Sequence, residues 1–105
     1  MTHTSEVHKN DIGTIFRVTI IDENDTIVDV SSASTKRILF KKPNGTLLEK
    51  TATFYTNGTD GIIQYITITG DLDTVGVWQL QAYVVLSGNQ YRSNITTFKV
   101  YRNLD

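Results

Sequence analysis

The sequence predicts an all-β fold, a sandwich of about seven antiparallel strands, and three observations support this. Apolar residues alternate with polar ones at period two in several segments, as at Phe16, Val18 and Ile20. Thr, Val, Ile and Tyr, which favour extended backbone, are plentiful in these segments. Turn-forming residues separate the segments at intervals of about 8–12 residues, and no stretch shows a helical period. A small closed β-barrel is the competing architecture.

The same alternation locates the individual strands along the chain. It recurs at Ile38 and Phe40, and again from Trp78 to Val84. Because Trp78 is in phase with the other apolar residues of its segment, we expect it to be the central aromatic residue of the core. The predicted strands span residues 14–21, 26–30, 35–42, 46–54, 61–69, 76–87 and 90–101.

Turn chemistry marks the connections between these strands. The strongest local signal is Pro43-Asn44-Gly45, in which proline presets the first turn position and glycine accepts a left-handed conformation. Ser87-Gly88-Asn89 predicts a second hairpin. Asp22–Asp25 forms a polar turn, and residues 70–76 form a short connector.

Bulk composition indicates one domain and excludes several classes of function. A chain of 105 residues fits a single domain, predicted at residues 12–105, preceded by an N-terminal arm at residues 1–11 that is either mobile or docked. The chain has no cysteine, which excludes disulfides and thiolate chemistry. The net charge is -1 with scattered lysines and arginines, so we expect no nucleic-acid partner. No apolar run approaches the ~20 residues of a membrane span, and the polar N-terminus lacks the pattern of a signal peptide.

Candidate catalytic residues are few, and we expect the protein to be no enzyme and to hold no cofactor or metal. The two histidines, His3 and His8, lie in the predicted arm, where nothing orients them. Paired carboxylates could support glycoside chemistry, and the candidates are Asp71 with Asp73, or Asp22 with Asp25. All of them lie in predicted turns, where aspartate is common for conformational reasons. Calcium binding at Asp22–Asp25 is the remaining alternative for that turn.

Candidate contacts with a partner come from two aromatic residues and from the two ends of the chain. Tyr83 and Tyr91 fall on the opposite phase from the predicted core, so they are either exposed contact residues for a sugar or a protein, or simply good strand formers. The arm, with Val7 and His8, and the tail that begins at Tyr101 could each extend the edge strand of a neighbouring protein.

The ordered set of motifs resembles the N-terminal immunoglobulin-like domain of phage baseplate upper proteins, over roughly residues 7–101. The resemblance implies an immunoglobulin-like antiparallel β-sandwich without catalytic residues. Family members usually carry glycine in the first turn, where this chain has Asp25, and they continue into long fibre regions, whereas this chain stops at Asp105. The motifs are Asp11–Phe16, Ile21–Asp25, Ile27–Ser31, Phe40–Thr46, Gly61–Tyr65 and Asp71–Leu80.

The resemblance implies a structural protein of a phage particle, made in the cytoplasm of the bacterial host and located in the virion. We expect a separate docking module of the tail, baseplate or fibre-attachment apparatus, present in many symmetric copies and bound to other virion proteins. Two alternatives stay open: a capsid decoration protein, and a module that binds carbohydrate or the host surface through Tyr83 and Tyr91.

Overall fold

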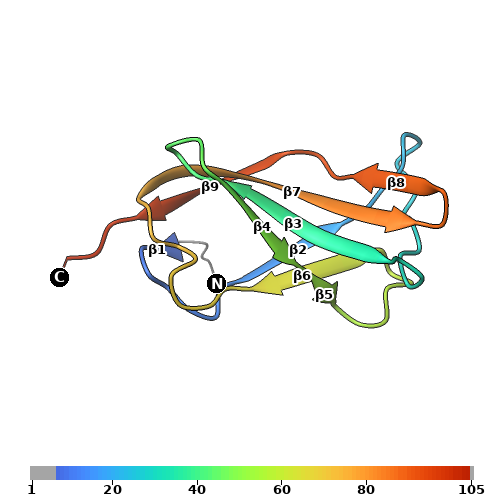
Figure 1. Ribbon diagram of the computed structural model, residues 1–105, viewed down its shortest axis with the longest axis horizontal. Coiled ribbons are helices and arrows are strands. Elements are labelled where there is room, and N and C mark those ends of the chain that lie inside the picture. The colour runs from blue at the N-terminus through green and yellow to red at the C-terminus, as the bar shows by residue number, and fades with distance from the viewer. Residues whose placement is uncertain (1–6, 105) are drawn as a thin grey trace.

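The computed structural model describes residues 7–104, and this part of the chain contains strands and turns but no helix (Figure 1). The all-β prediction is therefore confirmed. The strands are β1 (Val7–His8), β2 (Ile15–Thr19), β3 (Thr35–Lys41), β4 (Leu47–Thr51), β5 (Thr53–Phe54), β6 (Ile62–Ile66), β7 (Gly76–Leu86), β8 (Asn89–Arg92) and β9 (Thr96–Tyr101).

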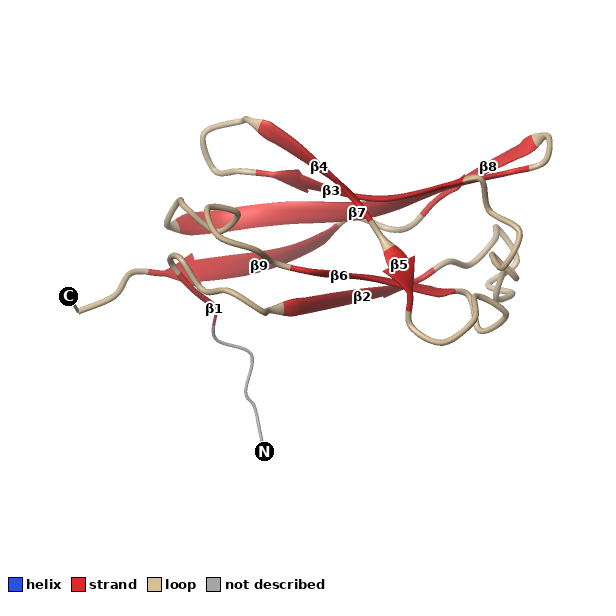
Figure 2. Cartoon of the chain, turned by 60° about the horizontal axis from the view of Figure 1, so that its bottom comes forward, coloured by secondary structure: helices blue, strands red, loops and turns tan. Residues whose placement is uncertain are grey.

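The strands form two sheets that face each other (Figure 2). The larger sheet has six strands in the order β1-β9-β7-β3-β4, with β8 also paired to β7, and it curls into a half-barrel. The smaller sheet has the order β2-β6-β5. The prediction of purely antiparallel pairing is wrong at one place, because β1 pairs with β9 in parallel and makes the larger sheet mixed. Within residues 7–104 no ladder joins the two sheets, so the barrel alternative does not apply.

Aromatic side chains fill the space between the sheets. Trp78 is fully buried, as predicted, and its indole Nε1 donates a hydrogen bond to the backbone oxygen of Thr74 at 2.9 Å. Phe98 lies against the indole with ring centroids 5.7 Å apart, and it also contacts Phe16 at 4.7 Å. Phe40 meets Phe16 edge to face at 5.3 Å. This packing links strands of both sheets through residues that the period-two pattern had marked as inward-facing.

The strand predicted at residues 26–30 is absent, apart from one isolated bridge. The carboxylate of Asp22 instead accepts hydrogen bonds from the backbone N–H groups of Asn24 (2.8 Å) and Thr26 (3.0 Å). Such a turn offers the backbone local partners that compete with a sheet ladder. Val30 is nevertheless fully buried, so the apolar pattern of this segment reports core contact without strand pairing.

The segment predicted as one strand at residues 46–54 crosses from one sheet to the other. β4 pairs with β3 in the larger sheet, and β5 pairs with β6 in the smaller one. Ala52 lies at the crossing and is buried, and its N–H donates to the oxygen of Lys36 at 2.9 Å. Alternation along the chain continues through this crossing, so the pattern alone reads as one strand.

The last predicted strand, residues 90–101, is interrupted by a β-bulge. On β7 two residues separate the pairing partners Leu80 and Tyr83, whereas three residues separate the opposing partners Arg92 and Thr96. Ser93 holds the bulge, because its Oγ accepts from the N–H of Ala82 at 2.8 Å. One extra residue on one strand of an antiparallel pair is the defining property of a bulge, and it divides the segment into β8 and β9.

Candidate interaction site

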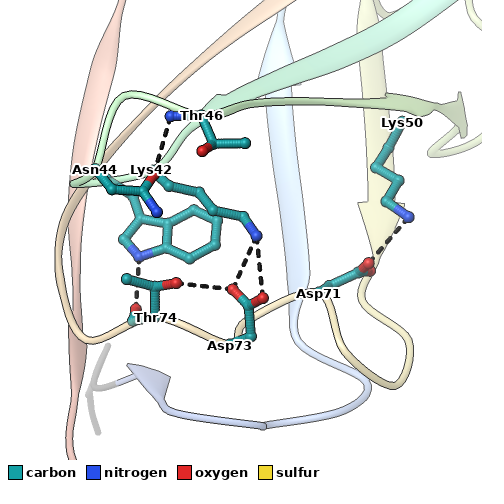
Figure 3. Close-up of polar contacts among 8 residues, drawn as sticks. Lys42, Asn44, Thr46, Lys50, Asp71, Asp73 and Thr74 are labelled. Atoms are coloured by element: carbon teal, nitrogen blue, oxygen red, sulfur yellow. Dashed lines mark hydrogen bonds and ion pairs between the residues drawn. The ribbon is translucent and has the colours of Figure 1, made fainter.

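A buried polar cluster connects the connector after β6 to both sheets. The side chain of Asp71 is only 6% exposed, and its Oδ1 lies 2.9 Å from the Nζ of Lys50 on β4 (Figure 3). Its Oδ2 accepts from the hydroxyl of Tyr65 on β6 and from the backbone N–H of Ile68 at 2.9 Å. We call Lys50, Tyr65 and Asp71 the polar cluster. It holds the two sheets and the connector in one arrangement.

The charge states of the polar cluster follow from these contacts. Burial raises the pKa of the Asp71 carboxyl, but the hydrogen bonds from Ile68, Tyr65 and Lys50 outweigh burial and leave the pKa below its ordinary value. The hydrogen bond to Asp71 raises the pKa of Lys50. Burial, together with the carboxylate of Asp71, raises the pKa of Tyr65. The cluster at neutral pH is therefore an ion pair with a protonated tyrosine.

Asp73, which the sequence paired with Asp71, makes a separate ion pair. Both of its carboxylate oxygens accept from the Nζ of Lys42, at 2.9 and 3.1 Å, and the hydroxyl of Thr74 donates to Oδ1 (Figure 3). The Lys42 Nζ also lies 5.8 Å from the centre of the Trp78 ring. Each of the two aspartates is thus bound to its own lysine, and these contacts hold the connector in place.

Of the other chemical candidates, His8 and Asp22 also have local contacts. His3 lies outside the described residues, and the ring of His8 lies 5.9 Å from the ring of Tyr101. The carboxylate of Asp22 is used by its own turn. Within residues 7–104 no group of three or more His, Asp or Glu side chains is placed to hold a metal ion.

The two predicted contact tyrosines lie on different faces of the larger sheet. Tyr83 is half-buried on the outer face, with the guanidinium of Arg92 4.6 Å from its ring centre. Tyr91 pairs with Val84, so both point to the same face, and Tyr91 packs against the core. The prediction that Tyr91 shares the phase of Tyr83 is therefore wrong. The two-residue turn pairs Leu86 with Asn89, so odd-numbered residues of β8 oppose even-numbered residues of β7.

The predicted contacts at the chain ends also divide into buried and exposed residues. Val7 is 8% exposed and pairs with Val100, so it belongs to the core rather than to an exposed arm. His8 is half-buried beside Tyr101, which is 37% exposed with the Nζ of Lys99 5.0 Å from its ring centre. The remaining residues of the predicted arm, 1–6, lie outside the described residues.

The structure reveals an apolar surface that the sequence analysis missed. Ile15 on β2 and Ile66 on β6 are directly opposite each other on the outer face of the smaller sheet, and Ile68 continues the outward phase. The three side chains are 46–57% exposed, and we call them the isoleucine cluster. The available signal was that Ile15 is apolar but out of phase with Phe16 and Val18. Grouped exposed apolar side chains are typical of surfaces that contact another protein.

A groove runs beside the isoleucine cluster, between the edge of β2 and the strand β9 of the facing sheet. Its apolar lining includes Phe16 and Val18 from β2 and Phe98 from β9. Leu80 and Thr96 complete the side formed by the larger sheet. The groove and the isoleucine cluster therefore lie on the inner and outer sides of one strand, β2.

Neither a scan against models of known protein families nor a search of curated proteins finds a match to this chain. Within residues 7–104 no helix is long and apolar enough to cross a membrane.

Proposed function

We propose that this protein is a non-enzymatic structural component of a phage virion, an immunoglobulin-like docking module of the tail, baseplate or fibre-attachment apparatus. The phage assignment rests on the sequence resemblance over residues 7–101. The docking role is supported by one structural observation, the isoleucine cluster beside the edge of β2 that no strand within residues 7–104 pairs with.

The strand order supports the immunoglobulin-like part of the proposal. Immunoglobulin variable-type domains have strands B, E and D in one sheet and strands G, F, C and C′ in the other. The order β2-β6-β5 matches the first set, and β9-β7-β3-β4 matches the second. The short parallel strand β1 beside β9 and the crossing of the chain at Ala52 are compatible with this assignment.

The isoleucine cluster suits a docking surface because its burial by a partner is favourable and its exposure otherwise is costly. Removing apolar surface from water contributes roughly 25 cal/mol per Å². Three half-exposed isoleucines give a modest interface, which many symmetric copies would strengthen through avidity. Ile12, 65% exposed, precedes β2 and is a further apolar residue near its start.

The test combines particle composition with a surface substitution. Mass spectrometry of purified phage particles is expected to detect the protein, and crosslinking is expected to join it to other virion proteins. Ile66→Asp should lower incorporation about tenfold while its melting temperature stays near that of the wild type, since the side chain is already half-exposed. Ile27→Asp, a change at an isoleucine outside the cluster that is 56% exposed against 46% for Ile66, is the matched control. Absence of the protein from particles, or equal incorporation of both variants, contradicts the proposal.

A further inference from the structure

β2 presents unpaired backbone groups at an open edge. Among residues 7–104 it is the end strand of the smaller sheet and pairs on one side only, with β6. The N–H of Ile20 donates to Gly61, and the oxygen of Thr14 accepts from Thr67, so even-numbered residues point their backbone groups at β6. In an antiparallel ladder the residues between them point the opposite way. The groups that face the open side belong to Ile15, Arg17 and Thr19.

β9, across the groove, has a matching open stretch. The oxygen of Tyr101 accepts from the N–H of Lys9 at 2.8 Å, so the odd-numbered residues of β9 point their backbone groups toward β1. β1 pairs only with Val100 and Tyr101. The Val7–Val100 pair uses the oxygen of Lys99, so within residues 7–104 the backbone groups of Thr97 and the N–H of Lys99 on that side extend past the end of the β1 pairing.

The floor of the groove is apolar. Its side chains come from the residues of β2 and β9 that alternate with those whose backbone groups face the open edges. Phe16, Val18 and Phe98 point inward, between the two open edges, and the rings of Phe16 and Phe98 are in contact. β2 and β9 run in opposite directions (Figure 1), so a strand parallel to β9, as β1 is, runs antiparallel to β2. One extended segment, running in a single direction, can therefore form backbone hydrogen bonds with both open edges.

We infer that the groove between β2 and β9 accepts an extended segment of a partner protein as an added strand, antiparallel to β2, with apolar side chains at alternate positions and acidic ones between them. Backbone pairing at an exposed sheet edge supplies affinity, and side-chain pockets at alternate positions supply specificity. This inference rests on the proposed docking function and names the form of its partner.

Charge favours acidic residues at the outward positions of the segment. Arg17 and Lys99 are the charged residues of β2 and β9, and both are cationic. Arg17 is exposed, with its guanidinium 4.2 Å from the ring centre of Tyr55 and its Nε donating to Gln64 at 3.1 Å. A carboxylate directly across from Arg17 on an added strand would be a favourable cross-strand pair.

The probe is a short labelled peptide of alternating valine and glutamate, and the readouts are fluorescence anisotropy and amide hydrogen exchange followed by NMR. Saturating peptide is expected to protect the amides of Ile15, Arg17 and Thr19 from exchange. The same peptide with lysine in place of glutamate should bind more weakly. Arg17→Pro removes an outward N–H that β6 does not use, together with the guanidinium. Arg17→Gln keeps this N–H and removes only the guanidinium, with its charge and its contacts to Tyr55 and Gln64. The proline variant should bind about tenfold more weakly than the glutamine variant, the effect of one lost hydrogen bond.

A second proline variant controls for general effects of proline on the sheet. Gln90 on β8 pairs with Val85 on β7, and the N–H of Gln90 also faces away from this ladder, so Gln90→Pro should leave binding unchanged. Equal binding of Arg17→Pro and Arg17→Gln, or protection at β8 instead of β2, overturns the inference. So does the absence of any binding to the folded wild type. That result leaves the docking proposal standing if particles still contain the protein. Protection at β2 without incorporation into particles overturns the proposed function and keeps the strand-addition site.

Discussion

Removal of the Asp71 carboxylate is expected to destabilise the fold far more than removal of any exposed acid. In Asp71→Ala the ammonium of Lys50, whose side chain is 23% exposed, loses its partner, and the N–H of Ile68 and the hydroxyl of Tyr65 lose their acceptor. Breaking a buried ion pair on one side costs about 3–5 kcal/mol. Because Lys50 can reach water, we expect the lower end of this range, about 3 kcal/mol.

Two further variants separate charge from hydrogen bonding. Asp71→Asn keeps an oxygen that can accept from Ile68 and Tyr65 but loses the charge, so its cost should be about 1–2 kcal/mol. Asp73→Ala removes the ion pair with Lys42, in which the aspartate side chain is 46% exposed, and should cost about 1 kcal/mol or less. This order of costs follows from the difference in burial between the two carboxylates.

Urea unfolding at neutral pH measures these differences, with thermal melting as a second readout. A loss of 3 kcal/mol should lower the melting temperature of a domain of this size by about 12 °C or more. Equal unfolding free energies for Asp71→Ala and Asp73→Ala would refute the argument that burial makes the polar cluster a major contribution to stability.

The polar cluster also predicts how stability depends on pH. The folded-state pKa of Asp71 lies below its ordinary value of 3.8, so the folded protein binds this proton less readily than the unfolded chain. The stabilisation is therefore complete above pH 3.8 and is lost as pH falls through the folded pKa. The difference between wild type and Asp71→Asn should be constant at neutral pH and should shrink in that acidic window. A difference that persists unchanged at low pH contradicts the assignment.

The remaining predictions concern the faces and turns of the sheets. Tyr91→Ala should cost about 2–3 kcal/mol because its ring packs against the core, whereas Tyr83→Ala on the outer face should cost about 1 kcal/mol; chemical denaturation of both variants checks this order. Gly76→Ala should cost at least about 2 kcal/mol, because the backbone has φ of +135° and the new Cβ would lie 2.7 Å from the Cγ of Pro43. Gly88→Ala, at φ of +76° with open space around it, should cost only about 1 kcal/mol. A larger cost for Gly88→Ala than for Gly76→Ala would show that the contact with proline is unimportant.

Local patterns were sufficient for much of the architecture. Alternation identified the central residues of β2, β3, β7 and β9 and the burial of Trp78, because residues two positions apart in a strand point to the same face. The proline–glycine turn at residues 43–45 joins β3 to β4, where Gly45 has φ of +90°. These features depend on neighbours in the sequence, so the sequence alone predicts them.

Local patterns were least informative at the candidate site. In the part of the chain that the structure describes, the edge of β2 is unpaired because β1 pairs with β9 and not with β2. The isoleucine cluster brings Ile15 and Ile66 together through a register that spans some fifty residues of chain. Neither relation affects the sequence pattern of a single segment. A pattern that describes one strand at a time therefore cannot predict which strand edges stay unpaired.

The sequence by itself thus determined that this protein is built from short strands, which residues of each strand share a face, and where most turns occur. Only the tertiary structure decided that Tyr91 faces the core, that the chain changes sheets at Ala52, and that Asp71 is buried against Lys50. The physical reason is that alternation fixes the relative direction of side chains within a strand. Pairing and register depend on backbone hydrogen bonds between distant segments, and only these bonds place one strand's faces and edges relative to another's.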